Sequence, residues 1–200
     1  YVSYNKLFLY ASSIAVYGST KSKNAITENF DLNPESFYGN SKYIAEKQIK
    51  FFSKIAKFNS VILRISSVYG PELKRQIIYQ IIKKTLHYKN YKLNGSILDS
   101  RQFLYIDDCV NILHKLIYKK HKKYEIYNIA GGEKIKINNI TKYTQKYLNK
   151  KVNVKFLNIL KSPSLPKLSN KKILKKVGKI KFTKFEWGLA ETIKWIINKF

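Results

Sequence analysis

The sequence of 200 residues contains no methionine and no long apolar run. Because the chain starts at Tyr1 and no residue can serve as the translation start, we expect it to be the C-terminal part of a longer protein. A membrane-spanning helix needs roughly 20 consecutive apolar residues, and no run approaches that length. The sequence therefore predicts no membrane contact, and any targeting segment is expected in the preceding part of the protein.

Cysteine and histidine are also scarce. The single cysteine, Cys109, excludes an internal disulfide, argues against a metal site built on thiolates, and fits a reducing, cytoplasmic setting. The three histidines, His87, His114 and His121, lack metal-binding spacing with carboxylates. We therefore predict no metal site.

Acidic residues are few, with 12 Asp and Glu against 39 Lys and Arg, so the formal charge is +27. Such a charge attracts polyanions at long range. However, the lysines are spread over every segment together with abundant Asn, Ile and Tyr, the bias of an AT-rich coding sequence. Because no nucleic-acid-binding motif accompanies the charge, we interpret it as a lysine-coated surface without a specific nucleic-acid partner.

The remaining composition, with 44% apolar residues, suits one domain with a sizeable core, with or without a small appendage. The short apolar run at 7–11, followed by two serines, is typical of a strand buried on both faces of a parallel sheet. Helical spacing then predicts a helix at about 38–57, and 61–65 predicts the next strand. Strand, helix and strand form the crossover unit of an α/β sheet.

Alternating elements continue along the chain. The patterns predict a helix at 76–86, a strand at 102–106 and a strand at 125–130 that is closed by two glycines. Asp107 is expected to cap a further helix after residue 106. Two sets of apolar residues are predicted to face the core: Ala45, Ile49, Phe52 and Ala56 on the first helix, and Val110, Leu113, Leu116 and Ile117 on the capped one.

Tyr38 and Lys42 form a candidate pair for acid–base catalysis. Residues four apart on a helix share a face, and a neighbouring ammonium favours a phenolate, which lowers the pKa of a tyrosine from about 10. The spacing alone carries little weight, because it occurs seven times where composition predicts about three. The context distinguishes this pair, since its helix follows a strand that ends in Ser12 and Ser13, where open α/β sheets bind ligands.

Five segments in this order resemble the extended short-chain dehydrogenase/reductase family, in its nucleotide-sugar epimerase and dehydratase branch. They are SSIAVYG at 12–18, FYGNSK at 37–42 followed by Glu46, LRISSVYGP at 63–71, RQFLYIDD at 101–108 and YNIAGG at 127–132. The resemblance covers nearly the whole chain. It implies a Rossmann-type doubly wound parallel sheet with a small α/β substrate-binding subdomain.

The resemblance also implies roles for Ser12 and Ser13 at the end of the first strand and for Tyr38 and Lys42 on the following helix. Tyr38 would exchange a proton with a sugar hydroxyl while hydride moves to or from the nicotinamide. Lys42 would hold the nicotinamide ribose and tune Tyr38, and Ser13 would hydrogen-bond the reacting oxygen. Ser12, Tyr38 and Lys42 would therefore bind the cofactor, expected to be NAD with NADP as the alternative.

Substrate binding and reaction type follow from other matched positions. The resemblance implies that Arg101 contacts the diphosphate of the substrate, a task that suits a bidentate guanidinium. Ser67 stands where epimerases commonly have Asn near the substrate phosphates. The 4,6-dehydratases carry an acidic pair after the strand-end hydroxyl, whereas this chain has Ile14 and Ala15. These side chains cannot transfer protons, which argues against dehydration and for 4-epimerisation or simple redox at a sugar carbon.

The predicted domain division begins with residues 1–70, the C-terminal part of the NAD-binding domain with the Ser, Tyr and Lys set. Residues 71–200 are expected to form mainly the substrate-binding part, with 102–130 returning to the Rossmann sheet. A glycine-rich strand-to-helix turn for the dinucleotide does not occur in the sequence. We expect this turn in the missing N-terminal part, so the fragment alone should be inactive.

Three hypotheses follow for function. The first is an NAD-dependent enzyme that epimerises a nucleotide-diphosphate sugar, at C4 of a UDP-linked hexose, through a transient keto-sugar. The second is a nucleotide-sugar reductase or dehydrogenase with net turnover of the cofactor. The third is a truncated, non-catalytic remnant that binds a nucleotide-sugar or a polyanion. The resemblance further implies a homodimer when the protein is full length.

Overall fold

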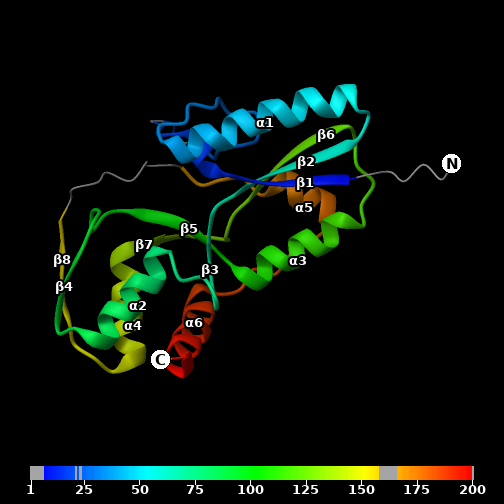
Figure 1. Ribbon diagram of the computed structural model, residues 1–200. Helices are drawn as coiled ribbons and strands as arrows, with labels where there is room; N and C mark the ends of the chain where they lie inside the picture. The colour runs from blue at the N-terminus through cyan, green and yellow to red at the C-terminus, as the bar shows by residue number, and fades with distance from the viewer. Residues whose placement is uncertain (1–6, 21, 23, 158–165, 200) are drawn as a thin grey trace. The chain divides into compact units, whose positions relative to one another are not determined.

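The computed structural model describes residues 7–20, 22, 24–157 and 166–199 (Figure 1). The chain divides into two compact units. The first comprises Tyr1–Ser66, Val110–Ala130 and Leu165–Ile180, and the second comprises Ser67–Cys109, Gly131–Ser164 and Lys181–Phe200. The assignment of a cofactor role to residues 1–70 and a substrate role to most of 71–200 stays a prediction.

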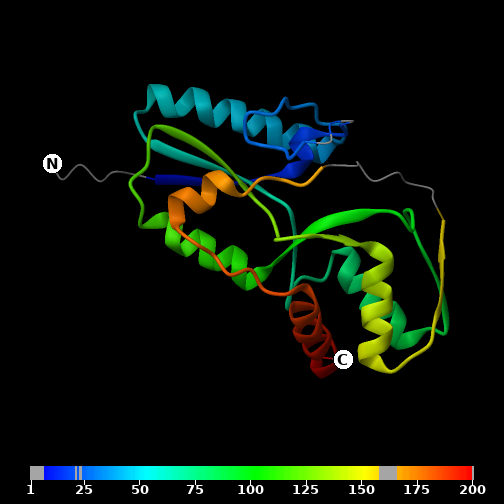
Figure 2. The same ribbon diagram turned by 180° about the vertical axis from the view of Figure 1, so that it is seen from behind.

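The first unit is built on a parallel sheet of three strands. In spatial order these are β1 (Leu7–Ser13), β2 (Asn59–Ile65) and β6 (Tyr124–Ile129). The helix α1 (Phe37–Ile55) covers one face, and α5 (Lys171–Val177) lies on the other (Figures 1 and 2). A short 3₁₀ helix, η1 (Ile14–Tyr17), directly follows β1. The predicted α/β class with a parallel sheet is confirmed.

β2 forms the centre of this sheet because its residues suit burial on both faces. Val61, Ile62 and Leu63 are almost fully buried, as expected for a strand between two parallel neighbours and two layers of helix. The register pairs Ser13 with Ile65, and Ile65 with Ile129. The carboxyl ends of the three strands therefore lie at the same edge of the sheet.

The second unit has its own strands and helices. A mixed sheet joins β3 (Ser67–Tyr69), β5 (Ser100–Tyr105) and β7 (Lys134–Lys136), with β3 parallel and β7 antiparallel to β5. A second, parallel pair consists of β4 (Asn90–Leu93) and β8 (Asn153–Phe156). The helices are α2 (Ile77–His87), α4 (Ile137–Leu148) and α6 (Phe185–Lys199). Of the segment 102–130, β6 thus joins β1 and β2, whereas β5 pairs with β3 and β7.

Aromatic side chains dominate the core of the second unit. The ring of Tyr69 contacts those of Phe103, Tyr105 and Phe185, with centroids 5.2–6.2 Å apart. Burial raises the pKa of Tyr69, and its hydroxyl donates to the carbonyl oxygen of Phe185. Edge-to-face and tilted contacts of this kind add to the stability from buried area, so this cluster joins β3, β5 and α6.

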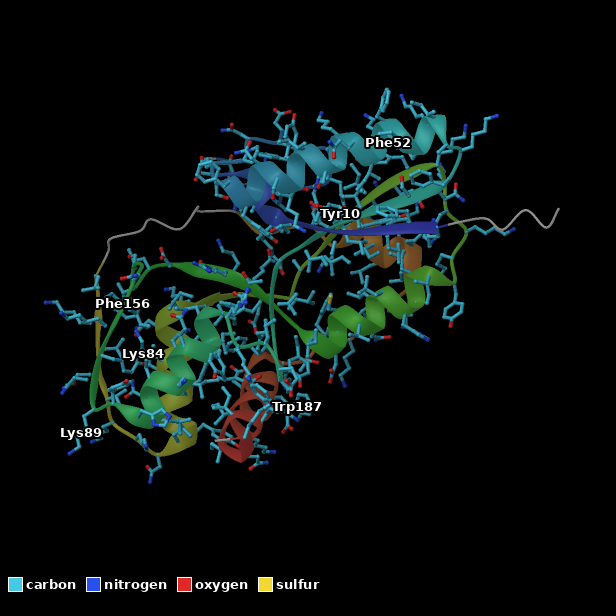
Figure 3. The ribbon with its side chains drawn as sticks, in the orientation of Figure 1. Tyr10, Phe52, Lys84, Lys89, Phe156 and Trp187 are labelled. Atoms are coloured by element: carbon cyan, nitrogen blue, oxygen red, sulfur yellow. The ribbon has the colours of Figure 1, made fainter. Side chains whose placement is uncertain are left out.

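The buried face of α1 differs from the predicted one. The sequence predicted an apolar stripe that includes Phe52 and Ala56, but both are exposed, and Phe52, labelled in Figure 3, is 54% exposed. The buried residues of α1 are Gly39, Glu46 and Ser53. The prediction was wrong for Phe52 and Ala56, whereas Ala45 and Ile49 are half-buried. It assumed an apolar inner face, but this helix packs on the sheet through the buried carboxylate of Glu46.

The helix α3 (Ile106–Ile117) also differs in detail from its prediction. It begins at Ile106, so Asp107 lies inside the first turn and does not precede it as a cap. The neighbouring Asp108 is buried and accepts hydrogen bonds from the amide and hydroxyl of Thr183. Leu116 is buried as predicted, but Val110 and Ile117 are 55% and 45% exposed. The buried stripe is instead Cys109, Ile112 and Leu116.

An ion-pair cluster ties β6 to α5 in the first unit. The carboxylate of Glu125 contacts His121 Nδ1 at 2.9 Å and Lys176 Nζ at 3.1 Å, and it accepts a hydrogen bond from the hydroxyl of Tyr127 at 2.8 Å. Burial alone would raise the pKa of Glu125, but the hydrogen bonds from His121, Tyr127 and Lys176 outweigh burial and lower it.

In the ranges that the structure covers, no helix is long and apolar enough to cross a membrane.

The lowered pKa of Glu125 predicts a pH-dependent contribution to stability. A carboxyl group whose pKa falls on folding stabilises the protein above its unfolded value of about 4.3, and the stabilisation is lost as pH falls through the folded value. At pH 6, Glu125→Gln should lower the free energy of unfolding by about 1.5–3 kcal/mol. Urea denaturation at pH 6, 4 and 3 should show this difference shrinking with acid, and a difference that stays constant to pH 3 would contradict the assignment.

Gly131 generates a second prediction, because a Cβ at this position would collide with the carbonyl oxygen of Phe103. Gly131→Ala should therefore destabilise the protein by about 1–3 kcal/mol through overpacking. The adjacent Gly132 is the matched control, since the nearest side-chain atom to its Cβ would be 3.8 Å away on Phe182, an ordinary contact. Thermal denaturation should show a clear loss for Gly131→Ala and a small change for Gly132→Ala, and equal losses would refute the steric argument.

Candidate active site

The carboxyl end of β1 carries two serines in different surroundings. Ser12 is buried, and its hydroxyl donates to Glu46 Oε1 at 2.5 Å. The side chain of Ser13 accepts a hydrogen bond from the amide of Ala15 at 3.2 Å and so caps η1. This bond uses Ser13 Oγ only as an acceptor, so the hydroxyl proton can still be donated to a bound group.

The first turn of α1 lies directly against η1. Ser36 caps the helix by accepting from the amide of Gly39 at 3.0 Å. A Cβ at Gly39 would lie 2.6 Å from the carbonyl oxygen of Ala15, so only glycine permits this close approach. The contact fixes the beginning of α1, and with it Tyr38, beside the segment that follows Ser13.

Lys42 extends from α1 to the end of β1. Its Nζ donates to the carbonyl oxygen of Ala11 at 2.8 Å and lies 4.9 Å from the ring centroid of Tyr10 and 5.7 Å from that of Tyr38. Tyr10 extends from β1 towards α1 (Figure 3). Tyr38 is 57% exposed. The structure thus brings Lys42, the ring of Tyr38 and the carboxyl end of β1 together.

A row of polar side chains crosses the sheet behind these residues. The register places Ser12 opposite Arg64 and Arg64 opposite Asn128, on three adjacent strands. All three are buried, and Glu46 of α1 is buried above them. Glu46 accepts from Arg64 Nε at 3.1 Å and from Arg64 Nη2 at 2.7 Å. One carboxylate therefore joins α1 to both β1 and β2.

The row continues through Tyr17 of η1. Arg64 Nη1 donates to the hydroxyl of Tyr17 at 3.1 Å, and that hydroxyl donates to Asn128 Oδ1 at 2.6 Å. Burial opposes the charge of Arg64, but its contacts with Glu46 and Tyr17 outweigh burial and raise the pKa of the guanidinium. Burial raises the pKa of Tyr17 despite the adjacent Arg64. Sequence reasoning gave Arg64, Tyr17 and Asn128 no role, and the available signal was an arginine in an apolar strand.

Of the predicted substrate residues, Ser13 lies in the first unit, and Ser67 and Arg101 lie in the second. Ser67 is in β3 and pairs with Phe103, two residues after Arg101 in β5, so the two residues lie on adjacent strands. Burial lowers the pKa of Arg101, and the nearby carboxylate of Asp99 opposes this shift. The roles of Ser67 and Arg101, like those of Ser12, Ser13, Tyr38 and Lys42, stay predictions.

Among the residues that the structure describes, acidic, histidine and cysteine side chains do not gather into a metal site. Across the described residues, no group of three or more such side chains is arranged to hold a metal ion. The groups near the end of β1 are instead an ammonium, a phenol and two hydroxyls. Such groups suit a polar organic ligand with hydroxyl groups.

Comparison with known proteins gives consistent results. Residues 2–130 match the model of the NAD dependent epimerase/dehydratase family. The uncharacterized UDP-glucose epimerase YtcB of Bacillus subtilis is 31% identical over 150 residues, which are 74% of this chain and 47% of the relative. The dTDP-4-dehydro-6-deoxyglucose reductase of Escherichia coli is 32% identical over 156 residues, 76% of this chain and 48% of the relative.

Among solved structures, UDP-glucuronic acid 4-epimerase from Bacillus cereus, in complex with UDP-glucuronic acid and NAD, matches with a TM-score of 0.87. The identity is 27%, and the match covers 97% of this chain and 62% of that one. This chain therefore spans about half the length of the curated relatives named above.

The buried pair of Glu46 and Arg64 predicts a non-additive mutational response. Arg64→Met leaves the carboxylate of Glu46 buried without its counter-charge, which should cost about 3–5 kcal/mol of stability. The double variant with Glu46→Leu should cost less than the sum of the two single variants, because neither charge is left alone. Urea denaturation of the four proteins of this cycle measures the coupling, and additive losses would contradict it.

Proposed function

Because this chain belongs to the NAD dependent epimerase/dehydratase family, we propose that the whole protein is an NAD-dependent 4-epimerase of a nucleotide-diphosphate sugar. The observation that carries the proposal is the approach of Lys42 and Tyr38 to the carboxyl end of β1. The similarity to a Bacillus subtilis UDP-glucose epimerase and a Bacillus cereus UDP-glucuronic acid 4-epimerase supports it.

The residues at the end of β1 fit a nicotinamide nucleotide. Lys42 presents an ammonium and Tyr38 a half-exposed phenol, at the edge where open parallel sheets bind ligands. NAD, when bound, supplies the acceptor and then the donor of the hydride at the sugar carbon. Lys42 would bind the hydroxyls of the nicotinamide ribose, and Ser12 would support this site from the strand.

The proton chemistry falls to Tyr38 and Ser13. Tyr38 takes the proton from the C4 hydroxyl as the keto-sugar forms and returns it when the carbon is reduced on its other face. The ammonium of Lys42 stabilises the phenolate that this transfer requires. Ser13 donates its hydroxyl proton to the reacting oxygen and so holds it beside Tyr38. Two opposite transfers leave the cofactor and the enzyme unchanged.

Dehydration is disfavoured by the residues that follow Ser13. Ile14 and Ala15 form the first half of η1, and neither side chain can donate or accept the protons that water elimination requires. We assign Ser67 and Arg101, on adjacent strands of the second unit, to the diphosphate of the substrate. A guanidinium binds such a group through two parallel hydrogen bonds.

A reductase of the same family is the second candidate. Its support is the 32% identity to the Escherichia coli dTDP-4-dehydro-6-deoxyglucose reductase. In this chain both reactions would use Tyr38, Lys42 and Ser13. They differ in cofactor balance, because a reductase consumes NAD(P)H in proportion to product and an epimerase recycles it.

The test is an assay of the full-length protein for interconversion of UDP-glucose and UDP-galactose and of their N-acetyl forms. Tyr38→Phe should lower kcat by at least about 100-fold, because it removes the group that transfers the proton. Tyr43→Phe is the matched control, since Lys47 lies 5.1 Å from the Tyr43 ring on the same helix, and it should retain activity.

Full activity in Tyr38→Phe would overturn the mechanism. Consumption of NAD(P)H in proportion to product would replace the epimerase with the reductase.

A further inference from the structure

Ser66 carries a hydroxyl that the protein itself does not satisfy. Within the part of the chain that the structure describes, Ser66 Oγ is the buried side-chain polar atom without a hydrogen-bond partner. The residue is 6% exposed. Buried polar atoms almost always have partners, and an exception indicates a water, an ion or a ligand that completes the site.

The position of Ser66 favours a ligand. Ser66 directly follows β2, and its amide donates to the carbonyl oxygen of Ile129 at 2.8 Å, which continues the pairing of β2 with β6 by one residue. The preceding residue, Ile65, pairs with Ser13. Ser66 therefore lies at the carboxyl end of the central strand, one residue beyond the register of Ser13, where open parallel sheets bind ligands.

The alternation of side chains along a strand shows on which face of the sheet Ser66 lies. Residues two apart share a face, so residue 66 belongs to the face of Arg64, whose guanidinium contacts Glu46 of α1. That face is also the one covered by the helix that carries Tyr38 and Lys42. The unpaired hydroxyl thus belongs to the same side and the same end of the sheet as the candidate active site.

A buried serine within β2 shows that burial alone does not leave a hydroxyl unpaired. Ser60 is fully buried near the other end of β2, and its Oγ donates to the carbonyl oxygen of Lys123 at 3.0 Å. The strand therefore satisfies its hydroxyl at the end remote from the candidate site and leaves one unsatisfied beside it.

We propose that Ser66 binds a ring hydroxyl of the sugar substrate, beside the hydroxyl on which Ser13 and Tyr38 act. This assignment rests on the proposed function and makes Ser66 a specificity-determining residue. A serine hydroxyl both donates and accepts hydrogen bonds, as a sugar hydroxyl does. In the proposed function Lys42 binds the ribose of the cofactor, and we therefore assign Ser66 to the sugar that reacts.

The experiment compares Ser66→Ala with Ser60→Ala in the full-length protein, by thermal denaturation without ligand and by binding of UDP-glucose, UDP and NAD. Ser66→Ala should leave the Tm unchanged or raise it, because it removes an unpaired polar group. It should weaken UDP-glucose binding by about 3–10-fold, the effect of one hydrogen bond, and leave UDP and NAD binding unchanged. Ser60→Ala should lower the Tm and leave all three affinities unchanged.

Each other outcome has a defined meaning. A Tm loss in Ser66→Ala that matches that of Ser60→Ala would show that water satisfies the hydroxyl in the free protein, and would overturn the inference. Weaker binding of UDP or NAD by Ser66→Ala would place Ser66 against the nucleotide or the cofactor and not against the sugar. This result would also overturn the inference. Unchanged UDP-glucose binding in Ser66→Ala would overturn this inference alone, whereas a wild-type protein that binds no UDP-sugar would overturn the proposed function as well.

Discussion

The buried ion pair between Glu46 and Arg64 is the interaction on which the first unit depends. Both side chains are withdrawn from water, and an isolated charge in such surroundings costs several kcal/mol. The pair is tolerated because its remaining hydrogen-bonding groups are used by Ser12, Tyr17 and the carbonyl oxygen of Glu28. Such a network has few alternative arrangements, so it fixes where α1 lies on the sheet. The placement of Tyr38 and Lys42 follows from it.

The pair also explains why α1 has an inverted pattern, with polar and small residues inside and large apolar residues outside. Ile44, Phe51 and Ile55 are each more than half exposed, while Gly39, Glu46 and Ser53 are buried. Small and polar residues let the helix approach the strands closely enough for one carboxylate to reach two of them. Its stability in this position therefore depends on specific hydrogen bonds more than on buried apolar area.

This inverted pattern of α1 is a feature that the sequence alone does not predict, although it predicts other elements well. Strands such as β2 and helices such as α2 are predictable because apolar runs and helical spacing are local signals. The inner face of α1 cannot be predicted in this way, because it depends on Arg64, which lies 18 residues after Glu46 in the sequence. The approach of Lys42 to the ring of Tyr38 was predictable from their spacing on one helix, but the row of Ser12, Arg64 and Asn128 depends on the register of three strands that are distant in the sequence.

The partner of Lys42 has a consequence for how this protein tolerates sequence change. Its ammonium is held by the carbonyl oxygen of Ala11, a main-chain atom that every amino acid provides. Substitution of the side chain at position 11 leaves that acceptor in place as long as the strand keeps its path. In a chain whose composition is strongly biased towards lysine, the position of the Lys42 ammonium therefore depends on the path of β1 and does not rely on a partner side chain that drift can remove.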